Sequence, residues 1–159
     1  VDPSLLTLEI TESTMMGDPA RSHRILRGLS DLGIEISVDD YGTGFSSLVN
    51  LRHLPVSEIK IDRSFVSELM VDSSDEVIVR STIDLGHNLG LQVVAEGVET
   101  QAIQDRLAEL GCDIAQGYGI SRPLPPSDFA PWMQNRLDQR AAGQGTDWTI
   151  EAPTIEQQG

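Results

Sequence analysis

The sequence predicts an α/β fold in which a parallel sheet is covered by helices. Two observations support this prediction: short apolar segments take turns with longer segments that look helical, and polar residues follow the ends of the apolar segments. Such an alternation is typical of parallel strands, because each helix carries the chain back to the starting edge of the sheet. The repeat fits a barrel of the TIM type or a doubly wound open sheet.

Five segments have the composition of strands. The clearest is 34–39, where Ile34, Ile36 and Val38 alternate with polar residues in the period of two that a strand requires. The other four are equally short and apolar. The predicted strands are 5–10, 34–39, 58–62, 91–95 and 113–116.

Capping residues and glycines mark the helices between these strands. Asp18 is expected to cap the first helix, with Pro19 at its first position and Gly33 at its end. Thr100 and Gly111 delimit a later helix in the same way. The predicted helices are 18–32, 46–54, 64–70, 73–88, 101–110 and 127–137.

Polar residues at the strand ends favour the barrel over the open sheet. Each of the five successive strands carries one such residue at or near its carboxyl end. In an open sheet these residues would be spread along one edge, whereas the strand ends of a barrel surround one mouth. The residues are Glu9, Asp39, Lys60, Glu96 and Gln116.

Composition and charge exclude several classes of function. The net charge of −14 opposes binding to a nucleic-acid polymer. No apolar run is long enough to cross a bilayer, so we expect a cytoplasmic segment without membrane contact, in a parent protein that is free to carry a membrane anchor elsewhere. The single cysteine, Cys112, agrees with a reducing compartment. Residues 141–159 are expected to form a flexible tail.

Converging carboxylates predict a metal site at the mouth of the barrel. The four acidic residues are Glu9, Asp39, Asp40 and Glu96. Carboxylates packed this closely repel one another unless a cation neutralises them. Oxygen ligands without histidine or cysteine indicate Mg²⁺ or Mn²⁺, and two such ions would activate water for attack on a phosphodiester. Lys60 would orient that water or stabilise developing charge.

Five short motifs follow one another along the chain. They are Leu8-Glu9-Ile10-Thr11-Glu12-Ser13, Asp39-Asp40-Tyr41-Gly42-Thr43-Gly44-Phe45-Ser46-Ser47-Leu48, Ile59-Lys60-Ile61-Asp62, Ala95-Glu96-Gly97-Val98-Glu99-Thr100 and Gln116-Gly117-Tyr118. In order and separation these motifs resemble those of EAL domains, the cyclic di-GMP phosphodiesterases of bacterial signalling. The resemblance covers about residues 5–125 and implies a TIM-type (β/α) barrel.

The resemblance also implies roles for individual residues. Metal ligands, directly or through water, would be Glu9, Asp39, Asp40 and Glu96. Catalytic residues around the attacking water would be Lys60, Glu96 and Gln116. Supporting residues would be Glu12, Asp62 and Glu99, of which Glu12 matches the residue that anchors the loop after Asp40. That loop resembles one that couples metal binding to dimerisation, so the resemblance implies a homodimer, and the family often carries an upstream sensor or GGDEF domain.

The departures from the family pattern are equally informative. The signature Glu-Ala-Leu, a phosphate-contacting Arg and a metal-binding Asn would precede the Glu9 motif and are absent. The resemblance therefore implies an incomplete barrel over 1–140 that lacks the first two βα units, with exposed sheet edges that favour self-association. We expect the parent protein to hydrolyse cyclic di-GMP to linear pGpG and this chain alone to be weak or inactive. The alternative is a module that binds the nucleotide or a partner without turnover.

Overall fold

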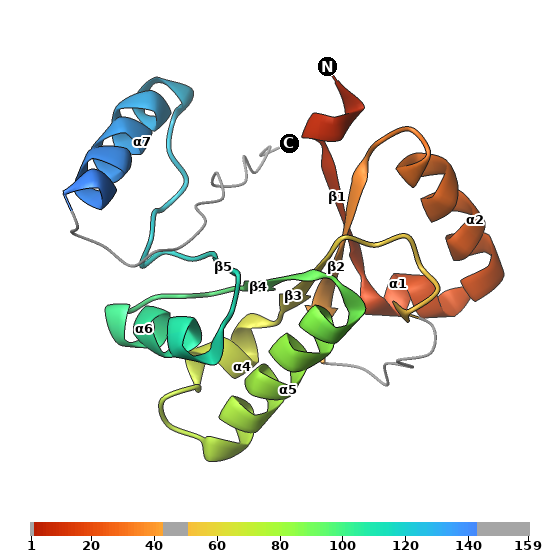
Figure 1. The fold of residues 1–159 in the computed structure, drawn as a ribbon, viewed down its shortest axis with the longest axis horizontal. Coiled ribbons are helices and arrows are strands. Elements are labelled where there is room, and N and C mark those ends of the chain that lie inside the picture. Colours follow the sequence, from red (N-terminus) through yellow and green to blue (C-terminus); the bar gives the residue numbers. More distant parts are fainter. Residues whose placement is uncertain (1, 43–50, 143–159) are drawn as a thin grey trace.

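A five-stranded parallel sheet organises the molecule (Figure 1). The structure is a computed structural model that describes residues 2–42 and 51–142. The strands occur in chain order across the sheet, and all four neighbouring pairs are parallel. They are β1 (Thr7–Thr11), β2 (Glu35–Tyr41), β3 (Glu58–Ile61), β4 (Gln92–Ala95) and β5 (Ile114–Ala115). All five predicted strands are confirmed, with ends that differ by one or two residues.

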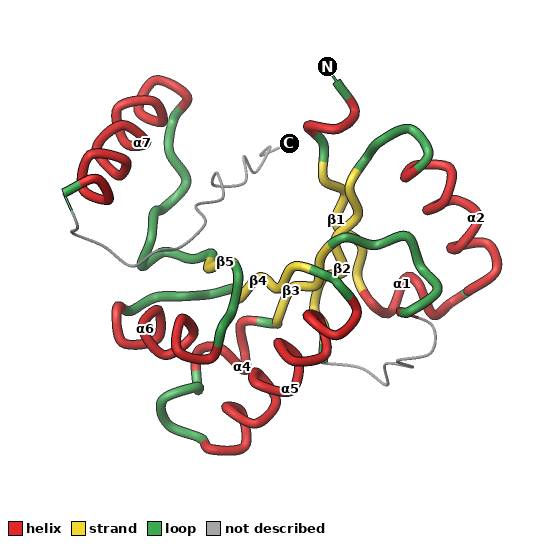
Figure 2. The backbone as a smooth tube through the Cα atoms, viewed as in Figure 1, coloured by secondary structure: helices red, strands yellow, loops and turns green. Residues whose placement is uncertain are grey.

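Helices connect successive strands, and α5 and α6 lie on the same side of the sheet (Figure 2). A short 3₁₀ turn, η1 (Pro3–Leu5), precedes β1. The helices are α1 (Glu12–Gly17), α2 (Pro19–Ser30), α4 (Arg63–Ser67), α5 (Ser73–Leu89), α6 (Gln101–Leu110) and α7 (Pro126–Ala141). Strands therefore alternate with helical segments as predicted, with two helices between β1 and β2, where the sequence predicts one, and two between β3 and β4.

The capping predictions hold where the helix ends are well defined. The Asp18 side chain accepts a hydrogen bond from the Arg21 backbone N–H at 3.0 Å, with Pro19 opening α2. The Thr100 hydroxyl accepts from Ile103 N–H at the start of α6, and Gly111 ends α6 in the left-handed conformation.

Three predicted boundaries change in the structure. The sequence did not predict α1, which begins directly at the end of β1 and has no side-chain cap to announce it. The predicted helix 64–70 is a shorter α4, which begins at Arg63 because Asp62 caps it and ends at Ser67. Helix α7 runs to Ala141, so the expected boundary at 140 falls inside a helix. Most of the predicted helix 46–54, and the expected tail from 143 onward, lie outside the described residues.

The two faces of the sheet differ in chemistry. One face is apolar, and α5 packs closely against it because Gly86 has no side chain: a Cβ there would lie 2.4 Å from Val93 Cγ2 and 3.1 Å from Ile59 Cδ1. The opposite face is polar, since Ser37 of β2 contacts Glu58 of β3 on it. Alternation along each strand therefore places the core on the helix side and leaves the other face for charged groups.

The sheet is open among the described residues, because β1 and β5 each pair with one neighbour. Strand β1 is also the more exposed of these two edges, with 40% of Leu8 accessible to solvent. An open sheet of five parallel strands is compatible with a segment of a barrel. In the part of the chain that the structure describes, no helix is long and apolar enough to cross a membrane.

Candidate functional site at the carboxyl ends of the strands

Lys60 is the centre of the polar face. Its ammonium Nζ lies 2.7 Å from Glu9 Oε1 and 2.5 Å from Glu96 Oε1, so one lysine on β3 joins a residue of β1 to a residue that follows β4. The Lys60 side chain is only 3% exposed. The structure thus brings together three of the predicted site residues at the carboxyl ends of three different strands.

The carboxylates around Lys60 carry more negative charge than its single ammonium neutralises. Burial alone would lower the pKa of Lys60, but hydrogen bonds to Glu9 and Glu96 together with their charges raise it above its ordinary value. Burial also raises the pKa of Glu96; Lys60 opposes this effect, and the negative charges of Asp39 and Glu9 add to it. The pKa of Glu96 thus stays raised although Lys60 contacts it, first because the carboxyl is buried and then because the negative charges of Asp39 and Glu9 act on it.

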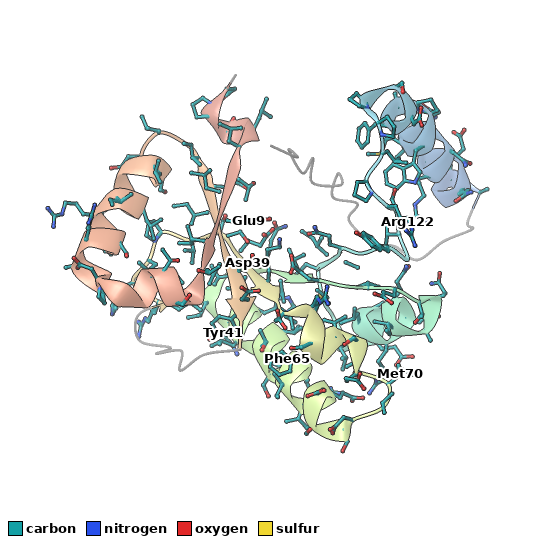
Figure 3. The ribbon with its side chains drawn as sticks, turned by 180° about the vertical axis from the view of Figure 1, so that it is seen from behind. Glu9, Asp39, Tyr41, Phe65, Met70 and Arg122 are labelled. Atoms are coloured by element: carbon teal, nitrogen blue, oxygen red, sulfur yellow. The ribbon has the colours of Figure 1, made fainter. Side chains whose placement is uncertain are left out.

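Asp39 and Asp40 end β2 at an irregularity in the sheet. The register between β2 and β3 shifts between Val38 and Tyr41, and Asp40 has a φ of 55°, in the left-handed region that non-glycine residues rarely adopt. The Asp40 backbone N–H donates to Asp39 Oδ1 at 2.9 Å. This irregularity brings two consecutive carboxylates to the end of β2, where Asp39 pairs with Thr11 of the neighbouring strand, two residues beyond Glu9 (Figure 3).

Asp40 is coupled to Asp62, the residue that follows β3. Burial, the charge of Asp39 and a side-chain hydrogen bond with Asp62 raise the pKa of Asp40. Burial alone would also raise the pKa of Asp62, but hydrogen bonds from the Ser64 hydroxyl and backbone N–H hold it below its ordinary value. Asp62 therefore has a second function as the cap of α4, which fixes its carboxylate beside Asp40.

The donor chemistry of the site fits a divalent cation. Its side chains supply carboxylate oxygens, and their excess negative charge is the condition under which a cation stabilises such a site. Across residues 2–42 and 51–142, no three acidic, histidine or cysteine side chains already stand in a metal-binding arrangement. Lys60 instead engages Glu9 and Glu96. Metal binding would therefore have to draw these carboxylates away from the ammonium.

A cavity of about 410 Å³ adjoins Glu96. Gln116 lines it and is held by two backbone hydrogen bonds, from Gln116 N–H to Ala95 O at 2.9 Å and from Val98 N–H to Gln116 O at 3.0 Å. The residues around the cavity are Arg63, Ser67, Glu96, Gly97, Glu99, Gln116, Gly117 and Tyr118. Two predicted catalytic residues, Glu96 and Gln116, and one predicted supporting residue, Glu99, thus line the same cavity.

Glycines allow the walls of this cavity to approach one another. A Cβ at Gly117 would lie 2.3 Å from both Val98 N and Val98 O. A Cβ at Gly97 would lie 2.6 Å from Arg63 Cβ, and its φ of 68° also favours glycine. The motif residues Gly97 and Gly117 therefore have a steric explanation in the packing of the loops after β4 and β5.

Glu12 is the first residue of α1, directly after β1, and its side chain is not described. The loop that Glu12 is predicted to anchor lies largely in 43–50, outside the described residues. Sequence reasoning did not single out Arg63, Ser67 or Tyr118 as cavity residues. Arg63 and Tyr118 follow predicted site residues by one or two positions, which is the signal that could have found them.

Fold and site together define a class of protein: an α/β domain of parallel strands whose charged residues gather at the carboxyl ends of those strands, next to a cavity. Comparison with known proteins identifies the family. A sequence profile of the family described as "EAL domain" matches residues 1–123. The chain belongs to the EAL domain family. Its five-stranded sheet is a segment of the TIM-type barrel fold of that family.

Three comparisons with two relatives illustrate the match. The bifunctional diguanylate cyclase/cyclic di-GMP phosphodiesterase MucR of Pseudomonas aeruginosa is 53% identical over 125 residues, which are 79% of this chain and 18% of MucR. A solved complex of the P. aeruginosa MucR phosphodiesterase with c-di-GMP has a TM-score of 0.78 and 52% identity, covering 80% of this chain and 52% of that one. A manganese/cyclic di-GMP complex of Klebsiella pneumoniae BlrP1 has a TM-score of 0.72 and 31% identity. The match covers 77% of this chain and 31% of the BlrP1 chain.

The chain is short relative to these proteins. It spans 17% to 18% of the length of three curated relatives, MucR of Pseudomonas aeruginosa, YkoW of Bacillus subtilis and DosP of Escherichia coli. What the names of these relatives say about activity and ligand therefore describes proteins several times longer than this chain.

Proposed function

We propose that this chain supplies the greater part of the catalytic site of a metal-dependent phosphodiesterase that hydrolyses cyclic di-GMP to linear pGpG. The observation that carries the proposal is the ion-paired arrangement of Glu9, Lys60 and Glu96 at the carboxyl ends of the strands. Three relatives that are 41% to 53% identical to this chain are named cyclic di-GMP phosphodiesterases, which supports the proposal.

Glu9, Asp39, Asp40 and Glu96 would hold the metal, for which we propose Mg²⁺ or Mn²⁺. The calcium/cyclic di-GMP and manganese/cyclic di-GMP complexes of the relative BlrP1 support the choice of a divalent cation. When bound, such ions supply an activated water and neutralise charge on the phosphate. The all-oxygen donor set is the one that Mg²⁺ and Mn²⁺ prefer.

The remaining residues would position the reactants. Lys60 is a permanently charged, buried donor that can hold a water or the developing negative charge near Glu96. Gln116 and Glu99 face the adjoining cavity, which offers room for part of a dinucleotide. Asp62 keeps the Asp40 carboxyl in place through their shared hydrogen bond, and Glu12 would anchor the loop after Asp40.

Assembly and location follow from the same proposal. We propose that residues 1–140 act as part of an EAL barrel in a cytoplasmic, homodimeric protein with an upstream sensor or GGDEF domain. The printed name of MucR, which joins a diguanylate cyclase to the phosphodiesterase, supports a second signalling domain in the parent protein.

The second candidate is a binding module without turnover. One observation favours it: no three carboxylates within the described part of the chain already form a metal-binding group. Such a module would bind cyclic di-GMP in the cavity beside Glu96 without hydrolysing it.

The deciding experiment is hydrolysis of cyclic di-GMP by this chain with Mg²⁺ or Mn²⁺, resolving pGpG from substrate by ion-exchange chromatography. Glu96→Ala is the inactive control, and Glu109→Ala, on the surface of α6, is the matched control that leaves the site intact. The enzyme proposal expects turnover, weak or absent in this chain alone and full in the parent protein, that disappears in Glu96→Ala and persists in Glu109→Ala. Substrate binding without product would support the binding module, and product formed equally by Glu96→Ala would overturn the assigned role of Glu96.

A further inference from the structure

The polar face contains a second buried pair beneath Lys60. The Ser37 hydroxyl on β2 donates to Glu58 Oε1 on β3, and these two residues are direct neighbours in the sheet. Ser37 is fully buried and Glu58 is 7% exposed. Neither residue belongs to the motifs of the family, and the proposed mechanism does not use them.

This pair lies on the path of the Lys60 side chain. Lys60 begins on β3 and reaches Glu9 on β1, two strands and about 10 Å away, so its side chain must cross β2. The residue of β2 that pairs with Glu9 is Ser37. Because Ser37 is small and faces the same side of the sheet, it leaves the space through which Lys60 and Glu9 meet.

Glu58 adds a charge to this space. It lies two residues before Lys60 on the same strand, so both side chains emerge on the polar face about 7 Å apart. Among the described residues, the Ser37 hydroxyl is the one hydrogen-bond donor to the Glu58 carboxylate, and no cation forms an ion pair with it. A carboxylate this buried is unfavourable without a nearby positive charge, and Lys60 is the cation on its own strand and face.

We propose that Ser37 and Glu58 are positioning residues for Lys60: Ser37 leaves room for Lys60 to reach Glu9, and Glu58 holds the ammonium on the polar face from below. The inference rests on the proposed function only for the catalytic role that it gives to Lys60. The position of Lys60 itself is a property of the folded chain and is measurable without substrate or metal.

The composition of the chain makes this measurement direct. Lys60 is the only lysine and Cys112 the only cysteine among the 159 residues. Lys60 lies on the polar face, whereas Cys112 is buried in the apolar core beyond the end of α6. Amine acylation therefore reports on Lys60 alone once the N-terminal amine is separated by peptide mass spectrometry, and thiol labelling reports on general opening of the core.

The experiment compares acylation of Lys60 and alkylation of Cys112 in wild type, Ser37→Leu, Glu58→Gln and Ser81→Leu. Leucine at 37 blocks the crossing, and glutamine at 58 keeps the acceptor for Ser37 but removes the charge. Ser81→Leu places the same change on the exposed surface of α5. Cyclic di-GMP turnover is followed in parallel as a separate readout.

We expect Lys60 acylation to accelerate about tenfold or more in Ser37→Leu, which displaces the side chain, and severalfold in Glu58→Gln, which removes a nearby charge that opposes local opening. Cys112 alkylation should stay at the wild-type rate in both, and Ser81→Leu should change neither label. Unchanged Lys60 acylation in Ser37→Leu and Glu58→Gln would overturn the proposal, as would equal acceleration of both labels, which would show a merely structural role. Absence of turnover in the parent protein would count against the proposed function and leave this result standing.

Discussion

Lys60 Nζ lies 2.7 Å from Glu9 Oε1, and this ion pair joins β3 to β1 across the strand between them. The pair is asymmetric in exposure, since the Lys60 side chain is 3% exposed and that of Glu9 is 43% exposed. Glu96, on the other side of Lys60, is 22% exposed. The ammonium is therefore the buried member of the group, and its removal would affect carboxylates on two other segments.

Lys60→Met should destabilise the chain by about 2 kcal/mol, less than the loss for a fully buried pair because Glu9 is partly solvated. The measurement is the free energy of unfolding in urea. Arg80→Met is the matched control, since Arg80 pairs with Glu76 on the surface of α5 and should contribute at most about 0.5 kcal/mol. Equal losses in the two variants would show that burial of Lys60 adds nothing.

Mn²⁺ should stabilise the folded chain, because it would neutralise carboxylates that Lys60 alone does not balance. Binding to the folded state at about a hundredfold excess over Kd corresponds to about 2.7 kcal/mol. The measurement is the Tm with and without Mn²⁺. The rise should be lost in Glu96→Gln and retained in Glu109→Gln, whose carboxylate lies on the surface of α6. A rise of the same size in Glu96→Gln would place the metal elsewhere.

The raised pKa of Glu96 should make the free energy of unfolding depend on pH. Burial and the charges of Asp39 and Glu9 raise its pKa above 4.5 in the folded chain. A carboxyl with a raised folded pKa stabilises the fold below its unfolded pKa, and this contribution is lost as the pH rises through the folded pKa. Without metal, wild type should therefore lose stability relative to Glu96→Gln from about pH 4.5 upward. A difference between the two unfolding free energies that is constant from pH 4 to 7 would contradict this.

The sequence predicts this fold because its local signals agree with one another. Asp18 and Pro19 begin α2, and Thr100 and Gly111 delimit α6, so each helix is bounded by residues that suit the ends of a helix. Helix α1 lacks such a signal, since Thr11 makes no capping hydrogen bond there. Its position depends on tertiary packing, which a local pattern does not encode.

The candidate site was predictable in its members but not in its pairing. Strand-end position alone identifies Glu9, Lys60 and Glu96 as neighbours. It does not show that Lys60 crosses β2, because this depends on the register that puts Ser37 next to Glu9. The bulge at Asp40 is likewise a property of the pairing between β2 and β3, and no residue in the motif predicts a φ of 55°.

Gly117→Ala should destabilise the chain by about 1–3 kcal/mol, because the added Cβ would lie 2.3 Å from the backbone of Val98. Gly28→Ala is the control, and we expect it to change the free energy of unfolding in the opposite direction. Gly28 lies inside α2 with no atom near its added Cβ, so alanine should stabilise the helix by about 0.5–1 kcal/mol. Urea unfolding of both variants tests the pair, and a neutral Gly117→Ala would show that the loops after β4 and β5 can separate.

Cys112 should react slowly in the folded chain. The residue is 7% exposed, its thiol Sγ lies 3.3 Å from the carbonyl oxygens of Val93 and Ile114, and burial raises the pKa of the thiol to about 12. The thiol is therefore protonated at pH 8, and a disulfide reagent should reach it only through opening, about a thousandfold or more slower than in the unfolded chain.

The raised pKa of Cys112 also makes the free energy of unfolding depend on pH in a definite direction. Because the folded pKa of Cys112 lies above its unfolded value of about 9, the thiol stabilises the fold below pH 9, and this contribution is lost as the pH rises towards 12. Cys112→Ala removes the ionisable group, so its unfolding free energy should fall less steeply than that of wild type between pH 8 and 10. Rapid reaction of the native thiol at pH 8, or identical slopes in the two proteins, would mean that Cys112 is accessible from solvent.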